Sequence, residues 1–249
     1  MIRYIDSRKM GRGHQGAVDS YFHFSFADYY NPDNVRFGVL RVINDDEVKP
    51  ETGFPPHSHA DMEIISYIID GELTHGDSMG NEETLSRGQV QYMSAGTGVT
   101  HSEMNYGKTP LRFLQIWILP DGKGHQPNYG GAKFQLADRY DQWLPLATGG
   151  ANPSAPIKVH QDINAYAAII TAGKKLDFAV AANRQAYLVL IEGRAEISAS
   201  VSGASVSEAS LSGVKLSKRD AAEIIGQNIT VAAAETAHVF IIEMAKSAE

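Results

Sequence analysis

Short apolar segments, each bounded by turn residues, recur along the whole chain. In the first half they are rich in β-branched and aromatic residues, which favour strands. They occupy residues 22–26, 37–43, 62–69, 89–93 and 111–119. Clusters of Gly, Asp, Asn and Ser follow them, at 70–71, 76–83, 94–98 and 120–124. Short strands with regularly spaced turns are typical of β-barrels and sandwiches, so the pattern predicts an all-β fold.

The strand pattern resumes in the second half after a segment rich in Gly and Pro, LATGGANPSAP, at 146–156. Strands are expected at 166–172, 185–198, 221–226, 228–235 and 238–244. ISYIIDGELTH in the first half resembles LVLIEGRAEIS in the second, since each has a buried strand, a turn with an acidic residue and Gly, and an alternating strand. The halves are therefore interpreted as two copies of one β-domain, covering 1–145 and 146–249.

Two segments favour short helices, near 136–143 and 161–166. The Ser/Ala-rich stretch at 198–213 predicts an alternating strand followed by an exposed loop.

Composition narrows the classes of function. The chain has 249 residues and a formal net charge of −7, and its Lys and Arg residues form no basic stripe, which argues against direct binding of nucleic acid. The N-terminus has no apolar signal-peptide core, and the chain has no apolar run long enough to span a membrane. We therefore expect a cytoplasmic protein. Cysteine is absent, so any metal ion must be held by His, Asp or Glu.

Two pairs of metal-binding residue types share the spacing i, i+2. His57 and His59 follow a Gly-Phe-Pro-Pro turn, and His101 and Glu103 lie some 40 residues on. In a strand, residues two apart point to the same face. If the two strands are neighbours, three imidazoles and one carboxylate meet, a set suited to a divalent metal such as Fe, Mn, Co, Ni, Cu or Zn. The alternative is that all four are ordinary polar residues at strand ends.

These residues also carry a family resemblance. HSHADMEIISYIIDGELTHGDSMGNEE at 57–83 and QYMSAGTGVTHSEMN at 91–105 resemble the two motifs of the cupin superfamily. With 23–48 and LQIWILPD at 114–121, the chain resembles the pirin family, of the bacterial type with quercetin dioxygenase-like activity. The resemblance is strong to about residue 125 and weaker, though continuous, to the end.

The resemblance implies a bicupin of two jelly-roll (double-stranded β-helix) barrels, with one metal site in the N-terminal barrel and a metal-free C-terminal barrel. It implies His57, His59, His101 and Glu103 as ligands. Glu63 then lies beside the site as a structural residue or one that orients a ligating imidazole. Iron(II) is the metal that the resemblance favours, with Cu, Mn, Co, Ni and Zn left open.

The implied activity is a quercetin 2,3-dioxygenase-like cleavage of flavonols by O2, with release of CO and with Glu103 as the base for the 3-hydroxyl proton. The alternative is a metal-binding regulatory protein that acts through a protein partner, with flavonol cleavage as a side activity. A monomer is expected, because no exposed apolar stripe demands a partner.

Other polar and aromatic residues receive structural interpretations. His75 and Asp77 are expected to form a hydrogen-bond network in a turn. Phe22, Phe24 and Phe26 are expected in the core, with some at the mouth of the cavity, and Trp117 in the core.

Overall fold

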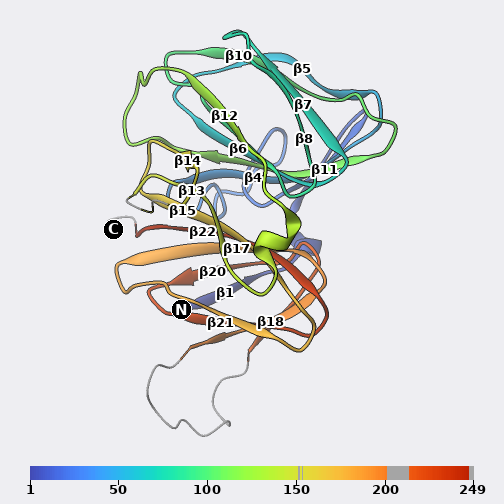
Figure 1. The fold of residues 1–249 in the computed structure, drawn as a ribbon. Helices are drawn as coiled ribbons and strands as arrows, with labels where there is room; N and C mark the ends of the chain where they lie inside the picture. Colours follow the sequence, from blue (N-terminus) through green and yellow to red (C-terminus); the bar gives the residue numbers. More distant parts are fainter. Residues whose placement is uncertain (151, 153, 201–212, 247–249) are drawn as a thin grey trace, which may run out of the picture. The chain divides into compact units, whose positions relative to one another are not determined.

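The computed structural model describes residues 1–150, 152, 154–200 and 213–246 (Figure 1). Within these residues the chain is built almost wholly of strands, and strands such as β4 (Leu40–Val48), β11 (Leu111–Ile118) and β17 (Arg184–Glu192) pair with their neighbours in antiparallel fashion. The chain packs as two compact units. The N-terminal unit comprises Met10–Leu136 and Thr148–Asp162, and the C-terminal unit comprises Met1–Lys9, Ala137–Ala147 and Ile163–Glu249. The division into domains at 145/146 stays a prediction.

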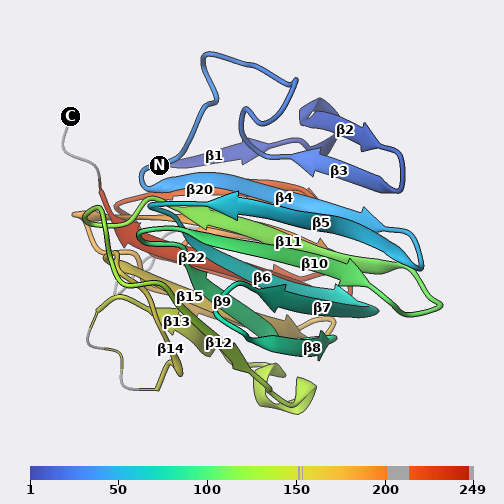
Figure 2. The same ribbon diagram turned by 90° about the horizontal axis from the view of Figure 1, so that it is seen from above.

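Two sheets form the N-terminal unit (Figure 2). The larger has the order β12-β9-β6-β11-β4-β3-β2 and the smaller β5-β10-β7-β8. The strands of the larger sheet are β2 (Gly11–Gln15), β3 (Val18–Phe22), β4 (Leu40–Val48), β6 (Glu63–Asp70), β9 (Val90–Ser94), β11 (Leu111–Ile118) and β12 (Asn128–Ala132). Those of the smaller sheet are β5 (Thr52–His59), β7 (Glu72–Asp77), β8 (Glu82–Ser86) and β10 (Val99–Asn105).

From β4 to β7 and again from β8 to β11, successive strands alternate between the two sheets, as they do in a jelly roll. The turn from β6 in one sheet to β7 in the other requires Gly71, whose φ is 75°. A Cβ at this position would lie 2.5 Å from the carbonyl oxygen of Pro110, so no other residue fits without a shift of the backbone. The Asp-Gly turn expected at 70–71 is thus a corner between the sheets.

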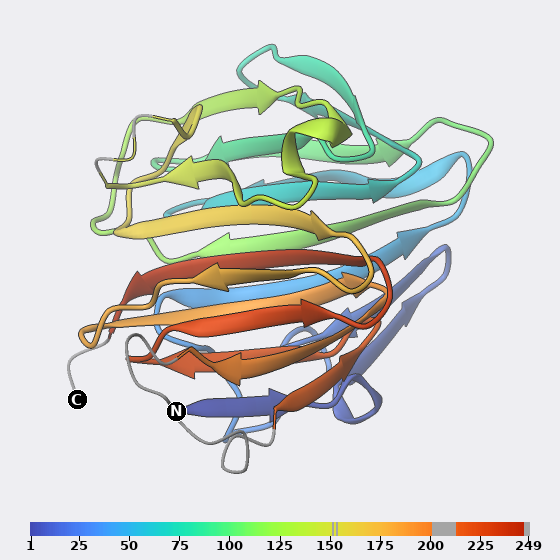
Figure 3. The same cartoon turned by 60° about the horizontal axis from the view of Figure 1, so that its bottom comes forward.

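The C-terminal unit repeats the two-sheet plan (Figure 3). Its larger sheet contains the run β1-β20-β17-β22-β15, and its smaller sheet the order β16-β21-β18-β19. The strands are β1 (Ile2–Ile5), β15 (Ile163–Ile170), β16 (Lys175–Phe178), β17 (Arg184–Glu192), β18 (Arg194–Ala199), β19 (Val214–Ser217), β20 (Ala221–Ile225), β21 (Ile229–Ala233) and β22 (Ala237–Ala245). The remaining elements are β13 (Leu144–Thr148), β14 (Ile157–Lys158) and the 3-10 turns η1 (Ser7–Lys9) and η2 (Leu136–Arg139).

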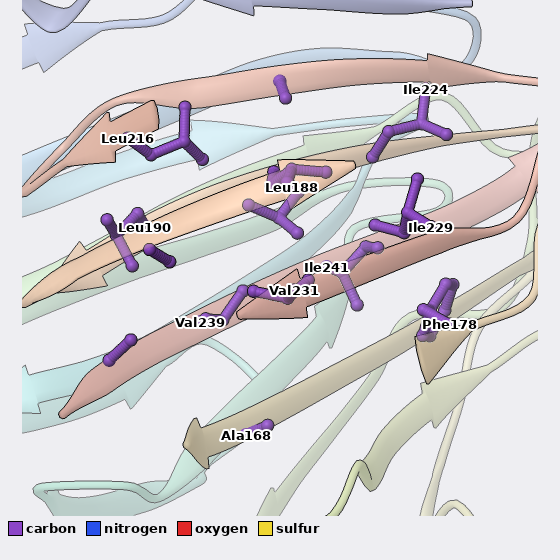
Figure 4. Close-up of a cluster of buried hydrophobic side chains, with 14 of the residues drawn as sticks. Ala168, Phe178, Leu188, Leu190, Leu216, Ile224, Ile229, Val231, Val239 and Ile241 are labelled. Atoms are coloured by element: carbon purple, nitrogen blue, oxygen red, sulfur yellow. The ribbon is translucent and has the colours of Figure 1, made fainter. Parts of the chain in front are cut away.

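An aliphatic core fills the space between the two sheets of the C-terminal unit. Leu188 and Ile241 of the larger sheet and Ile229 and Val231 of the smaller one belong to a single buried cluster (Figure 4). The side chains are 0% exposed at all four positions. This interior is closed by apolar packing.

The all-β prediction is confirmed, with local corrections. The helix predicted over 161–166 is wrong, because Ile163–Ile170 pairs with β22 along its length and this pairing outweighs the helical preference of its alanines. Near 136–143 a single 3-10 turn forms at Leu136–Arg139. Strand β3 ends at Phe22, where the strand predicted for 22–26 was to begin. Of the loop predicted within 198–213, residues 201–212 lie outside the described residues.

A buried histidine should make stability depend on pH. His23 is 0% exposed, and burial lowers its pKa to about 4. Between pH 6.5 and 4 the unfolded chain therefore binds a proton there that the folded chain does not, so the free energy of unfolding falls as the pH falls. We expect His23→Gln to remove up to about 1.4 kcal/mol of this loss per pH unit. Denaturant unfolding of parent and variant at pH 7 and pH 5 measures the difference; identical losses would contradict the assignment.

Candidate metal centre

Three histidines meet on two neighbouring strands of the smaller sheet. His57 on β5 pairs in register with His101 on β10, and His59 lies two residues further along the same face of β5. Each offers one ring nitrogen, and these nitrogens all lie within 4.8 Å of one another. The ring centroids of His57 and His101 are 4.5 Å apart. A group of this kind could hold a metal ion.

An irregularity in β5 aims the first two histidines. The register between β5 and β10 shifts between His101 and Glu103, so that Phe54 faces Glu103 and the Pro55-Pro56 pair falls in the bulge. Proline has no N–H to donate, so it is confined to bulges and edge strands, and β5 is the edge of its sheet. His57 Nδ1 donates a hydrogen bond to the Pro55 carbonyl at 2.8 Å. This bond fixes the tautomer and leaves Nε2 with a lone pair for a ligand.

Burial keeps two of the imidazoles neutral. It lowers the pKa of His59 to about 4 and that of His101 to about 3, with the neighbouring histidines adding to the effect. Within the described residues, neither ring nitrogen of His101 has a hydrogen-bond partner, although both are buried. A buried polar atom without a partner is costly. Neutral imidazoles with free lone pairs are the form that binds a metal ion, so the triad fits one.

Glu103 lines a cavity together with His57 and His59. It is not part of the group of three histidines whose ring nitrogens lie within 4.8 Å of one another. It is 1% exposed. Ser66 Oγ lies 2.8 Å from its Oε1, and the side-chain amide of Gln91 donates to the same oxygen. Gln115 donates to Oε2, which keeps a second lone pair. Burial raises the pKa of Glu103, against the opposing effect of these donors. Its role as a ligand stays a prediction.

A cavity of about 360 Å³ opens beside the triad. One part of its wall is aromatic and the other is polar, including Glu103 and Gln115. The ring centroid of Trp117 is 4.8 Å from that of His59 and 5.4 Å from that of Phe26, in edge-to-face contacts. The aromatic wall is made of Phe22, Phe26, Phe54 and Trp117.

Trp117 was expected in the core, yet it is only partly buried and lines the cavity. The sequence did contain a sign of this position. Trp117 lies two residues after the polar Gln115 on β11, so both side chains point to the same face of the sheet. Phe22 and Phe24 are buried as expected, whereas Phe26 is only partly buried; Phe22 and Phe26 line the cavity.

Glu63 serves a different segment. It is 1% exposed and accepts hydrogen bonds from Ser94 Oγ at 2.6 Å, from the backbone N–H of His160 at 2.9 Å and from the Tyr92 hydroxyl. Within the described part of the chain, none of its hydrogen bonds reaches the triad. Glu63 therefore ties β6 to β9 and to the segment around residue 160.

The hydrogen-bond network predicted for His75 and Asp77 forms, although both residues lie within β7 and the turn follows them. His75 Nε2 lies 3.0 Å from Oδ2 of Asp77. The other oxygen, Oδ1, accepts hydrogen bonds from the backbone N–H groups of Met79 and Asn81. The His75 ring stacks on Tyr129 at a centroid distance of 4.2 Å, and its centroid lies 5.4 Å from that of His101. The network therefore packs against one ring of the triad.

Family models match both parts of the chain. The model described as Pirin matches residues 5–118, and the one described as the quercetinase C-terminal cupin domain matches residues 146–244. A pirin-like protein of Caulobacter vibrioides is 38% identical over 95% of this chain and 97% of that protein. The chain belongs to the pirin family. The predicted bicupin is confirmed, since a crystal structure of Escherichia coli YhhW covers 100% of both chains with a TM-score of 0.88 and 33% identity.

Two relatives of this pirin bear on its chemistry. A protein of Escherichia coli named quercetin 2,3-dioxygenase is 38% identical over 79% of this chain and 84% of its own length. The bacterial pirin YhhW was also solved in complex with nickel(II), with a TM-score of 0.87, 32% identity and 99% and 100% of the chains covered. Within the described residues, this pirin has no helix that could span a membrane.

Removing one imidazole should abolish metal binding. We expect His101→Ala to lose bound divalent metal, because its ring completes the group of three and has no other partner in the described residues. Elemental analysis after reconstitution and dialysis measures the metal per chain. His14→Ala, which removes an exposed histidine of the same unit, is the matched control and should retain the parent's metal. Equal metal in His101→Ala and the parent would place the site elsewhere.

Proposed function

We propose that this pirin is a metal-dependent dioxygenase that cleaves flavonols such as quercetin and releases carbon monoxide. The observation that carries the proposal is a triad of which two members, His57 and His59, line an aromatic cavity of about 360 Å³, a volume within the range of small-molecule sites. Relatives named quercetin 2,3-dioxygenase support the choice of reaction. Both atoms of O2 enter the products, and one ring carbon leaves as CO.

His57, His59 and His101 would hold one divalent ion as neutral ligands, with Glu103 as the fourth. Three nitrogens and one oxygen suit borderline metals, and we propose Fe(II), with Cu, Mn, Co, Ni and Zn as other ions that this donor set accepts. When bound, the ion supplies positive charge that favours the ionised form of a flavonol oxygen.

The protein's own groups bind, orient and deprotonate the substrate. The flat ring system fits against the aromatic wall formed by Phe22, Phe26 and Trp117. Glu103 Oε2 would take the proton of the 3-hydroxyl through its one free lone pair, which the carboxylate would have to release from the ion for this step. Burial makes the carboxylate a stronger base. Gln115, Gln91 and Ser66 hold that carboxylate in one orientation.

Release of CO from quercetin in air tests the reaction. We expect protein reconstituted with Fe(II), Mn(II), Co(II), Ni(II) or Cu(II) to release CO with at least one of these ions, and His57→Ala to abolish the release. Gas chromatography measures CO against quercetin consumed. No release with any fully loaded ion would overturn the proposal and favour the regulatory alternative, in which the metal-bound chain binds a protein partner.

The assignment of Glu103 has its own test. Glu103→Gln keeps the shape of the side chain but cannot accept the proton as a carboxylate does, so turnover of the metal-loaded variant should fall about 100-fold. Metal content is measured on the same sample, so loss of the base can be separated from loss of the ion. Full turnover in a fully loaded variant would show that Glu103 is not the base.

A further inference from the structure

A row of polar side chains crosses the larger sheet of the N-terminal unit, beneath the metal centre. The strand registers pair Gln91 with Ser66, Ser66 with Gln115 and Gln115 with Asn44. The first three members all bond to Glu103. Asn44 is the next member of the row, 3% exposed, and its Oδ1 is buried with no hydrogen-bond partner in the described residues.

Asp46 repeats this situation two residues along the same face of β4. It is 2% exposed, and its Oδ1 is likewise buried with no partner among the described residues. Its side-chain hydrogen-bonding partner is Ser20, which lies opposite in register on β3. Two adjacent unsatisfied oxygens in an interior are costly, because each has lost its hydrogen bonds to water.

Both side chains line the cavity beside the triad. χ2 is a soft torsion in Asn and Asp, so a rotation about it is the movement that would bring either oxygen to face a ligand in the cavity. Strands β4 and β11 are neighbours, about 4.8 Å apart. Asn44 therefore lies one strand further from Glu103 than Gln115, the residue that hydrogen-bonds to Glu103. A flat ligand against Trp117 and Phe22 therefore has the base at one position and these two oxygens at another.

We propose that Asn44 and Asp46 form a subsite that binds hydroxyl groups on the rings of the substrate, separate from the hydroxyl that Glu103 deprotonates. The inference rests on the proposed function and names its substrate class as polyhydroxylated aromatic compounds. A ring hydroxyl donates to Asn44 Oδ1. It donates to Asp46 when that carboxyl is ionised and accepts from it when the carboxyl is protonated. Burial raises the pKa of Asp46 to about 7, so both forms occur near neutral pH.

Binding rather than turnover tests this subsite. Quercetin and 3-hydroxyflavone share the reacting 3-hydroxyl and the neighbouring carbonyl, but only quercetin carries further ring hydroxyls. Calorimetric titration of the Ni(II)-loaded protein without oxygen gives the dissociation constant of each. We expect the parent to bind quercetin about tenfold more tightly than 3-hydroxyflavone, the amount expected for one or two net hydrogen bonds.

Two variants and one control make the test specific. Asn44→Leu and Asp46→Ala should each bring the ratio of the two dissociation constants toward one, with 3-hydroxyflavone still bound. Asp46→Ala leaves a void that could itself disturb binding. Asn44→Leu replaces the side chain by one of similar volume, so it tests the subsite without a void. Glu47→Gln changes an exposed position on the same strand and should keep the parent's ratio. Metal content and melting temperature confirm that each variant is folded.

The outcomes separate the subsite from the function. An unchanged ratio in both folded variants would overturn the subsite, while binding of both flavonols would leave the proposed function standing. Failure of the fully loaded parent to bind either flavonol would overturn the proposed function and the subsite with it. A ratio that collapses in the variants but not in Glu47→Gln supports the assignment.

Discussion

The buried carboxylate of Glu103 is the constraint on which the N-terminal unit depends. Removing an ionised carboxylate from water is expensive unless donors replace the lost hydration. Glu103 belongs to the smaller sheet. Within the described residues its side-chain donors are Ser66, Gln91 and Gln115, which come from three neighbouring strands of the larger sheet. Satisfying the carboxylate therefore ties the two sheets together at the point where the triad lies, and the fold and the site share one hydrogen-bond network.

The second constraint is the placement of histidines on an edge strand. A regular edge strand exposes a row of unpaired backbone groups. Without the bulge, β5 would pair with β10 in one continuous register and would be such a strand. Pro55 and Pro56 remove two donors and fall where the register shifts. The same bulge supplies the carbonyl that fixes the His57 tautomer. Protection of the edge and orientation of a ring nitrogen that could bind a metal thus arise from one local irregularity.

The sequence was informative where a local pattern decides the structure. Period-two apolar runs located most strands, and the i, i+2 spacing of His57 and His59 and the position of His101 identified the three rings that meet. What it could not show depends on which strands are neighbours. Gln115, Asn44 and Asp46 look like ordinary polar interruptions of apolar strands. Only the registers of β4, β11 and β6 place Gln115 and Asn44 in one row with Ser66, and Asp46 lies two residues along β4 from Asn44. The alanines of 163–170 likewise gave no sign that pairing with β22 would outweigh helical propensity.

Charge is the physical reason that the proposed function assigns an anionic aromatic ligand to this cavity. The imidazoles of His59 and His101 are neutral, since burial lowers their pKa values to about 4 and about 3. A divalent ion held with Glu103 as the one carboxylate leaves a net charge of about +1 in a poorly hydrated cavity, where Coulomb interactions are strong. A second permanently ionised carboxylate would cancel that charge. Under the proposed function, an ionised flavonol oxygen would supply part of the counter-charge, and Asp46, whose pKa burial raises to about 7, would add to it only while it is ionised.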